Sequence, residues 1–159
     1  MSGTVRIWDT VNEEHSCKLE IKPIAGQIFD IAWSPDSKRV VVVGDGREKY
    51  GAAFFMVSEF FGVLKNDCLN QDSGASVGEI TGHSKTITTV DFKQTRPFRV
   101  VTGSDDLQIN WFEGPPFKYK FHHKHHERFV NCVRFAPNGE LFLSVGQDKQ
   151  VGELKTLAS

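Results

Sequence analysis

The 159-residue sequence has no apolar run of the ~18–20 residues that a membrane-spanning helix needs. Its longest apolar stretches, 40–43 and 52–57, are far shorter. Neither sign of charge dominates, and the formal charge of −1 gives no overall field that would attract nucleic acid or an anionic membrane. The N-terminal residues also lack the basic-then-apolar order of a secretory signal. These absences predict a cytoplasmic protein whose partners are neither nucleic acid nor membrane.

Cysteine is also scarce, since Cys17, Cys68 and Cys132 are scattered along the chain and form no C-x-x-C pair. This spacing is typical of reduced thiols and argues against a disulfide framework or a zinc site. Helical periodicity is missing too, because no long segment repeats its apolar residues about every 3.6 positions. By contrast, 13 Phe and 14 Gly indicate β-strands that are separated by tight turns. The expected fold class is therefore all-β.

A pair of strand patterns with a turn between them occurs three times, which indicates an internal repeat. The aromatic residues that end the first strand of the last two copies, Phe92 and Phe135, are 43 positions apart. This period lies within the ~40–45 residues of a four-stranded propeller blade. In each copy, eleven positions separate the aromatic residue from the glycine after the second strand: Trp33 to Gly44, Phe92 to Gly103 and Phe135 to Gly146.

The first copy precedes the second by 59 positions, and the surplus falls at 57–71, which has no counterpart in the other copies. Removing this insert would join the apolar stretch 53–56 directly to Asp72. Two interpretations are open. The codons of Val57–Ser58 can contain a splice donor, and the codon of Gln71 can form an acceptor end. The insert could therefore be a retained intron, which would keep the reading frame because it consists of whole codons. The alternative is a surface loop, which propellers tolerate between strands.

The sequence also carries the elements of a WD-repeat signature, namely a Gly-His pair, a turn Asp and a Trp-Asp pair. In such blades the His, a strand Ser or Thr, the turn Asp and the Trp form a hydrogen-bonded chain that locks the outer strand to the inner ones. In the second copy, Thr88 or Thr89 is the candidate strand residue and Trp111 is the nearest Trp. Asp105 is an alternative to Asp106 in the turn. The residues assigned to this structural role are Trp8, Asp9, His83, Asp106 and Asp148.

Two features could instead indicate chemistry. His83 and its turn Asp have the composition of a catalytic dyad, but no Ser or Cys nucleophile lies in a recognisable elbow. The segment 121–126 (FHHKHH) holds four His, yet neighbouring strand residues alternate faces and no Cys or acid completes a tetrahedral set. We expect segment 121–126 to be a solvated loop. The glycine-rich segment 44–51 lacks the pattern of a phosphate-binding P-loop. The sequence therefore predicts no catalytic residue, no cofactor and no metal.

Six strings of the sequence resemble one family far more specifically than a Trp-Asp pair does. They are 44–51 (GDGREKYG), 76–83 (SVGEITGH), 93–99 (KQTRPFR), 102–106 (TGSDD), 113–118 (EGPPFK) and 129–135 (FVNCVRF). In this order they resemble the actin-interacting protein 1 family, also called the WD repeat protein 1 family. The resemblance implies two linked seven-bladed propellers without a catalytic site. This chain then corresponds to about three blades of the first propeller, in segments 1–10, 11–56 plus 72, 73–113 and 114–159.

The resemblance also implies a function. The family binds actin filaments together with cofilin and promotes the disassembly of cofilin-bound filaments, which would place the protein at the actin cytoskeleton. The alternative is a generic WD-repeat scaffold for other protein partners, because a fold alone does not fix a function. An acidic pair beside an exposed aromatic residue would suit a partner with a basic rim and a hydrophobic slot. The residues predicted to contact a partner are Glu48, Lys49, Asp105, Asp106, Phe117 and Lys118.

Some of these residues have a plainer interpretation, in which Asp106 caps its turn and Phe117 packs on the neighbouring blade.

The number of blades in this chain is too small for a closed ring, since a ring usually takes about four to eight and the remaining blades are absent from this chain. Unpaired strand edges, such as those expected at 5–8 and 141–144, attract other chains. We therefore expect the 159 residues alone to aggregate easily and not to disassemble filaments.

Overall fold

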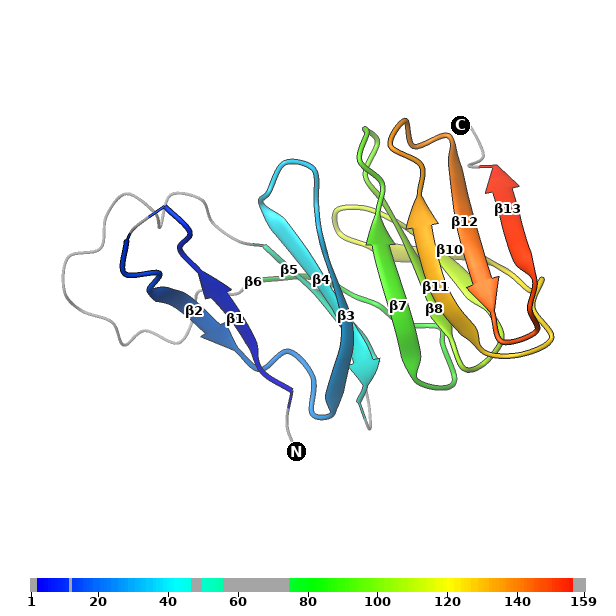
Figure 1. The fold of residues 1–159 in the computed structure, drawn as a ribbon, viewed down its shortest axis with the longest axis horizontal. Coiled ribbons are helices and arrows are strands. Elements are labelled where there is room, and N and C mark those ends of the chain that lie inside the picture. The colour runs from blue at the N-terminus through cyan, green and yellow to red at the C-terminus, as the bar shows by residue number, and fades with distance from the viewer. Residues whose placement is uncertain (1–2, 12, 47–49, 56–74, 156–159) are drawn as a thin grey trace.

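The computed structural model describes residues 3–11, 13–46, 50–55 and 75–155, and every regular element among them is a β-strand (Figure 1). The insert 57–71 lies outside the described residues. Within the described part of the chain, no helix is long and apolar enough to cross a membrane. The strands are β1 (Val5–Trp8), β2 (Cys17–Ile21), β3 (Gln27–Trp33), β4 (Arg39–Asp45), β5 (Gly51–Phe55), β6 (Ala75–Glu79), β7 (Ile87–Phe92), β8 (Arg99–Ser104), β9 (Ile109–Glu113), β10 (Lys118–His123), β11 (Val130–Phe135), β12 (Leu141–Gly146) and β13 (Val151–Lys155).

The strands form four antiparallel sheets that follow one another along the chain. Their strand orders are β1-β2, β3-β4-β5-β6, β7-β8-β9-β10 and β11-β12-β13, so each sheet is a meander. The first strands of successive sheets, β3, β7 and β11, lie side by side (Figure 1). The fourth strand of each complete sheet, β6 or β10, comes from the start of the next sequence segment. The described sheets form an open row, which confirms the predicted all-β fold of consecutive blades without a closed ring.

Strand β4 is buried on both faces, as its continuous valine run predicts. Val40, Val41, Val42 and Val43 are all 0% exposed. Val41 and Val43 belong to the core shared with the β7–β10 sheet, whereas Val40 and Val42 pack with Val5 of β1. A strand that lies between two packed sheets needs no alternation of apolar and polar residues.

Two apolar clusters join the sheets face to face. The first lies between β3–β6 and β7–β10, and in it the ring of Phe92 meets that of Phe117 edge-on at 5.3 Å between centroids. The second lies between β7–β10 and β11–β13, where the ring of Trp111 on β9 lies 5.8 Å from that of Phe135 on β11 and 5.9 Å from that of Phe142 on β12, between centroids. Burying one such side chain contributes about 1.5–3 kcal/mol. The large number of phenylalanines in the sequence therefore supplies the contacts between blades.

The turn between β7 and β8 is one residue longer than the turns between β3 and β4 and between β11 and β12. As a result, Ser104 pairs with Ile87, at the position where Gly44 pairs with Ile28 and Gly146 pairs with Val130 in the other two sheets. The predicted equivalence of Gly103 to these two glycines is wrong, because equal counting along the sequence hid the extra residue. The pairings that set the register are Trp33 with Val40, Phe92 with Val100 and Phe135 with Phe142.

Apolar side chains are exposed at both ends of the row of sheets. On β3, Phe29, Ile31 and Trp33 are between 43% and 52% exposed. On β12, Leu143 is 48% exposed and Val145 is 39% exposed. The two-stranded β1-β2 sheet covers a smaller area than a four-stranded sheet would. Exposed faces of this kind usually mark surfaces that another element covers.

Candidate functional site

His83 lies in the connection between β6 and β7, and its two ring nitrogens bind this connection to β8 and to the turn that follows β8. Its Nδ1 lies 2.9 Å from Oδ2 of Asp106, in the turn after β8, and its Nε2 lies 2.7 Å from Oγ1 of Thr102 on β8. The backbone N–H of Ser84 also donates to Asp106, at 2.9 Å. The His83 and Asp106 side chains are only 0% and 4% exposed. The preceding Gly82 has a φ of +96°, a conformation that few residues other than glycine adopt, and it turns the chain into this position.

His126 forms the same arrangement in the β11–β13 sheet. Its Nδ1 lies 2.9 Å from Oδ2 of Asp148 and its Nε2 lies 2.9 Å from Oγ of Ser144. The backbone N–H of Glu127 donates to Asp148 at 3.0 Å, just as Ser84 donates to Asp106. Successive blades therefore repeat one His–Asp–hydroxyl network. His83, Asp106 and Asp148, to which the sequence analysis gave a structural role, are all members of these networks.

The sequence interpretation of His126 as part of a solvated loop is wrong, because this side chain is 3% exposed. A usable signal was present: His126 follows His83 by 43 positions, which is the period of the repeat. The segment 121–126 also belongs partly to β10, which extends to His123. No group of three or more His, Cys, Asp or Glu among the described residues could hold a metal ion.

Two further assignments in the His83 network are also wrong. Thr88 and Thr89 lie on β7, and their hydroxyls bond elsewhere, to Gly103 and Val130 and to Asp30 respectively. The hydroxyl that reaches His83 comes from β8 instead. Trp111 belongs to the cluster between β7–β10 and β11–β13, whereas its neighbour Phe112 belongs to the other cluster. Because adjacent strand residues face opposite sides, the Trp lies on the wrong face to join the network.

The Trp8–Asp9 pair has a different setting from the one expected. Trp8 is 55% exposed at the end of β1, so it joins no buried network. Asp9 accepts a hydrogen bond from the backbone N–H of Val11 at 2.8 Å and lies 3.3 Å from Nζ of Lys18. Asp9 therefore stabilises the connection that follows β1. The exposure of Trp8 follows from the small size of the β1-β2 sheet.

The two buried carboxylates are stabilised in their charged form. Burial alone would raise the pKa of Asp106, but the hydrogen bonds from His83, Ser84 and Gln108 outweigh it and leave this pKa below its ordinary value. The pKa of Asp148 is also lowered, because hydrogen bonds from Gln150, His126 and Glu127 outweigh its desolvation. By contrast, desolvation raises the pKa of Asp105. Since the imidazole of His83 is enclosed, the His83–Asp106 pair is built to hold strands together, and substrate could not reach it.

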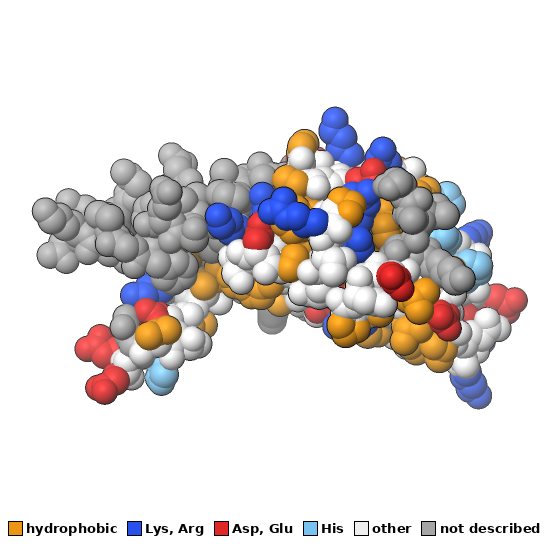
Figure 2. Space-filling model, turned by 90° about the horizontal axis from the view of Figure 1, so that it is seen from above, with side chains coloured by type: hydrophobic (Ala, Val, Ile, Leu, Met, Phe, Trp, Pro, Cys, Tyr) orange, Lys and Arg blue, Asp and Glu red, His pale blue; other side chains and the backbone are white. Residues whose placement is uncertain are grey.

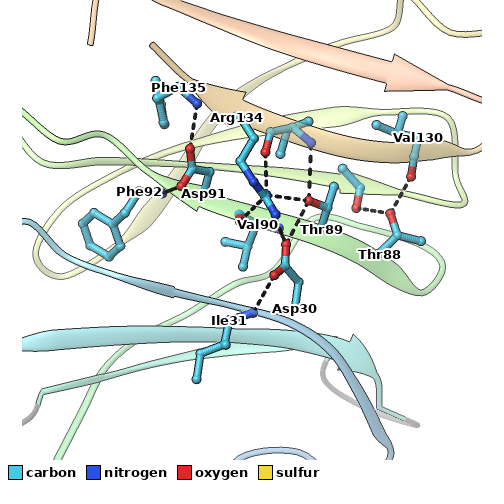
Figure 3. A network of polar contacts seen from close by, with 12 residues as sticks. Asp30, Ile31, Thr88, Thr89, Val90, Asp91, Phe92, Val130, Arg134 and Phe135 are labelled. Carbon is cyan, nitrogen blue, oxygen red and sulfur yellow. Dashed lines mark hydrogen bonds and ion pairs between the residues drawn. The ribbon is translucent and has the colours of Figure 1, made fainter. Parts of the chain in front are cut away.

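A second polar network crosses the inner strands of three consecutive sheets (Figure 3). Oδ2 of Asp30, on β3, accepts hydrogen bonds from the backbone N–H of Val90 and from the hydroxyl of Thr89 on β7, both at 3.0 Å. Asp91 of β7 repeats the pattern and accepts the backbone N–H of Phe135 on β11 at 2.6 Å. Burial raises the pKa of Asp91, although its two backbone hydrogen bonds oppose that rise. Each inner strand therefore offers a carboxylate to the next one.

Arg134 of β11 spans all three inner strands. Its Nη1 lies 3.2 Å from Oδ2 of Asp30 and donates to the hydroxyl of Thr89 and the carbonyl of Val90 on β7. The same atom donates to the carbonyl of Val133 at 2.7 Å. Figure 3 shows this side chain reaching from β11 across β7 toward β3. No motif of the sequence points to this network, because its members come from positions that share no repeated pattern.

The residues predicted to contact a partner do not form one surface. Asp105 and Asp106 follow β8, whereas Phe117 comes directly before β10 and Lys118 begins it, at the opposite end of the same sheet. The predicted exposure of Phe117 is wrong, because this ring is 3% exposed and packs on Phe92. Lys118 is exposed. The other two predicted residues, Glu48 and Lys49, lie outside the described residues.

The repeated networks coincide with a known family pattern. The family model "WD domain, G-beta repeat" matches residues 74–113 and 117–151, and these two segments contain the His83 and His126 networks. Together with the open row of antiparallel sheets, this match identifies a WD-repeat protein.

Similarity to named proteins extends over almost the whole chain. It is 58% identical over 150 residues to the 66 kDa stress protein of Physarum polycephalum. It is 54% identical over 151 residues to WD repeat-containing protein 1 of Bos taurus and of Gallus gallus. These alignments cover 94–95% of this chain but 22% of each relative, so the chain spans about a fifth of their length. The predicted resemblance to the WD repeat-containing protein 1 family is confirmed.

Proposed function

We propose that this chain is part of an actin-filament-binding WD-repeat protein that promotes the disassembly of cofilin-bound filaments. The observation that carries the proposal is the 54% identity to WD repeat-containing protein 1 along 95% of the chain. The proposed partners are actin filaments and cofilin, and the proposed location is the cytoplasmic actin cytoskeleton.

The geometry supports a binding role over an enzymatic one. In the described residues the His–Asp pairs are enclosed and bonded to Thr102 or Ser144, so they lack an accessible nucleophile. The inner-strand network of Asp30, Asp91 and Arg134 fixes the blades relative to one another. Rigid blades hold surface loops in fixed positions, which is the usual basis of protein recognition by repeat folds. We therefore propose that the protein has no catalytic site, cofactor or metal.

Co-sedimentation tests the proposal. The full natural chain is centrifuged with actin filaments, with and without cofilin, and the fraction in the pellet is measured. We expect more protein in the pellet when cofilin coats the filaments, and faster loss of filament mass in a parallel light-scattering assay. A chain that stays in the supernatant in both mixtures would instead be a generic WD-repeat scaffold for other proteins.

A further inference from the structure

One end of the sheets carries a concentration of basic side chains. The turns β3–β4, β7–β8 and β11–β12 lie at this end, and the β9–β10 turn joins them because β9 runs antiparallel to β8. Figure 2 looks onto the end that is at the top of Figure 1 and shows Lys and Arg side chains gathered over its middle. We call this surface the basic turn face. It consists of Lys38, Arg39, Lys93, Arg96, Arg99, Lys118 and Lys120.

Acidic side chains at the same end neutralise part of this charge. Arg39 pairs with Asp36, and Arg99 and Lys120 both lie 3.2 Å from the carboxylate of Glu113. The other four basic residues of this face have no acidic ion-pair partner among the described residues. Within the described part of the chain, no ion pair involves Lys38, Lys93, Arg96 or Lys118. A local excess of positive charge thus stands out from a chain whose formal charge is −1.

Phe98 organises the centre of the basic turn face. The guanidinium carbon of Arg39 lies 5.0 Å from the centre of this ring and that of Arg96 lies 4.8 Å from it. The ring is 7% exposed, because it packs in the core against Phe92 and also lies beneath the two guanidinium groups. Stacking on an aromatic ring fixes the plane of a guanidinium group, which then presents its N–H donors in a defined direction. Carboxylates are the groups that such a fork binds with two parallel hydrogen bonds.

The four turns also place apolar residues between the charges. Pro35, Pro97, Pro115 and Pro116 are exposed at this end. Proline rings offer small apolar surfaces between cations but no large apolar patch that could enter a lipid bilayer. A membrane or a nucleic acid also meets the charge of the rest of this chain, and its formal charge of −1 gives no net attraction. A short peptide, by contrast, meets only the local face.

We propose that the basic turn face binds an acidic segment of a partner protein, in which Asp or Glu side chains pair with Arg96, Lys38 and Lys118. This surface is separate from the His–Asp networks, and the proposal does not depend on binding to actin filaments. Because the contacts are ionic and exposed, binding weakens as salt is added. The stacked Arg96 would orient a carboxylate of the acidic segment and so give specificity, whereas the surrounding lysines would attract the segment by their charge.

Fluorescence anisotropy with a labelled oligoglutamate peptide and the full natural chain tests this proposal. We expect saturable binding that Arg96→Glu and Lys38→Glu each weaken by about tenfold. Arg128→Glu is the matched control, because Arg128 is exposed at the opposite end of the sheets and carries the same charge. Arg96→Lys keeps the charge but loses the planar fork, so its affinity should lie between those of wild type and Arg96→Glu. Thermal melting of each variant verifies that it is folded.

Three outcomes would overturn the proposal. The first is absence of oligoglutamate binding by the folded wild-type chain. The second is equal weakening by Arg128→Glu and Arg96→Glu, which would reflect net charge alone. The third is equal or tighter binding to a DNA duplex or to phosphatidylserine vesicles, with the same response to Arg96→Glu, which would show that the face binds any polyanion. None of these results bears on filament co-sedimentation, so the two proposals can fail independently.

Discussion

Asp30 and Arg134 are 104 positions apart in the sequence, yet their side chains form an ion pair of 3.2 Å between Oδ2 and Nη1. Asp30 lies on β3 and Arg134 on β11, so the pair reaches across the intervening strand β7 (Figure 3). Thr89 of β7 bonds to both of them. This contact links three consecutive blades directly. It therefore helps to fix the angle between blades, on which the shape of any larger ring depends.

Substitution of these two residues should reveal their coupling. Asp30→Ala should lower the free energy of unfolding by about 1–3 kcal/mol, because the N–H of Val90 and the hydroxyl of Thr89 lose their acceptor. Arg134→Ala should cost less, about 1 kcal/mol or below, because its side chain is 52% exposed. Urea denaturation of the two single variants and the double variant measures the coupling. Losses that add to within about 0.3 kcal/mol would show that the pair is not coupled.

Acid should weaken the His83–Asp106 network. The pKa of Asp106 is lower in the folded chain than its ordinary value of 3.8, so the ionised carboxylate stabilises the fold above that pH. This contribution disappears as the pH falls through the lowered pKa. Asp106→Asn should therefore cost about 1–3 kcal/mol at neutral pH. The difference between wild type and variant should shrink on acidification below 3.8, when followed by thermal melting.

Asp105→Asn is the matched control for this pH dependence. Burial raises the pKa of Asp105, so its ionised form is disfavoured in the fold above the ordinary value of 3.8. Replacing it should leave stability at neutral pH unchanged or slightly higher. An equal loss from Asp105→Asn and Asp106→Asn would contradict the assignment of Asp106 to the network.

The sequence predicted the strands well because their apolar patterns are local. The first strands of the three repeated patterns, which were expected to end at Trp33, Phe92 and Phe135, are β3, β7 and β11, and they end at these residues. The repeat carries His83, Asp106 and Asp148 at recognisable positions, and in the structure all three take part in His–Asp hydrogen bonds. Thr102 was missed in favour of Thr88 and Thr89, because two adjacent threonines on β7 looked equivalent to a hydroxyl on β8.

The inner-strand network and the location of Phe117 could not be predicted for a different reason. Both depend on which residues of separate blades face one another, and this follows from register and from the length of each turn. The β7–β8 turn, for example, has one residue more than its counterparts. Phe117 follows two prolines in a turn, which suggests exposure, but the turn folds its ring back onto Phe92. No local sequence pattern indicates which residues of separate strands and turns will be in contact.

Asn110 is expected to be a site where substitution stabilises the protein. Its side chain is 0% exposed, and neither its Nδ2 nor its Oδ1 has a hydrogen-bond partner among the residues that the structure describes. An unsatisfied buried polar group costs about 1–3 kcal/mol, and Val has a higher preference for strands than Asn. Asn110→Val should therefore raise the free energy of unfolding by about 1 kcal/mol, measured by urea denaturation. A loss of stability would show that the amide is satisfied in solution, for instance by a buried water.

Phe117 should prove essential for stability, and Lys118 should not. Removing the Phe117 ring leaves a cavity beside Phe92 and should lower the free energy of unfolding by about 3–5 kcal/mol. Lys118→Ala should change it by less than about 0.5 kcal/mol, because this side chain is exposed and has no ion-pair partner among the described residues. Differential scanning calorimetry of the full natural chain separates the two variants.

The Phe117→Ala variant also decides what the Phe117 ring does in filament disassembly. If the ring acts through packing, Phe117→Ala should lose activity and stability in parallel, and activity should return at a temperature at which the variant is folded. If the ring met a partner directly, activity would fall while the melting temperature stayed near that of wild type. The burial of Phe117 at 3% exposure favours the first result. A folded Phe117→Ala variant that binds cofilin-coated filaments poorly would contradict this structure-based assignment and return the residue to the binding surface.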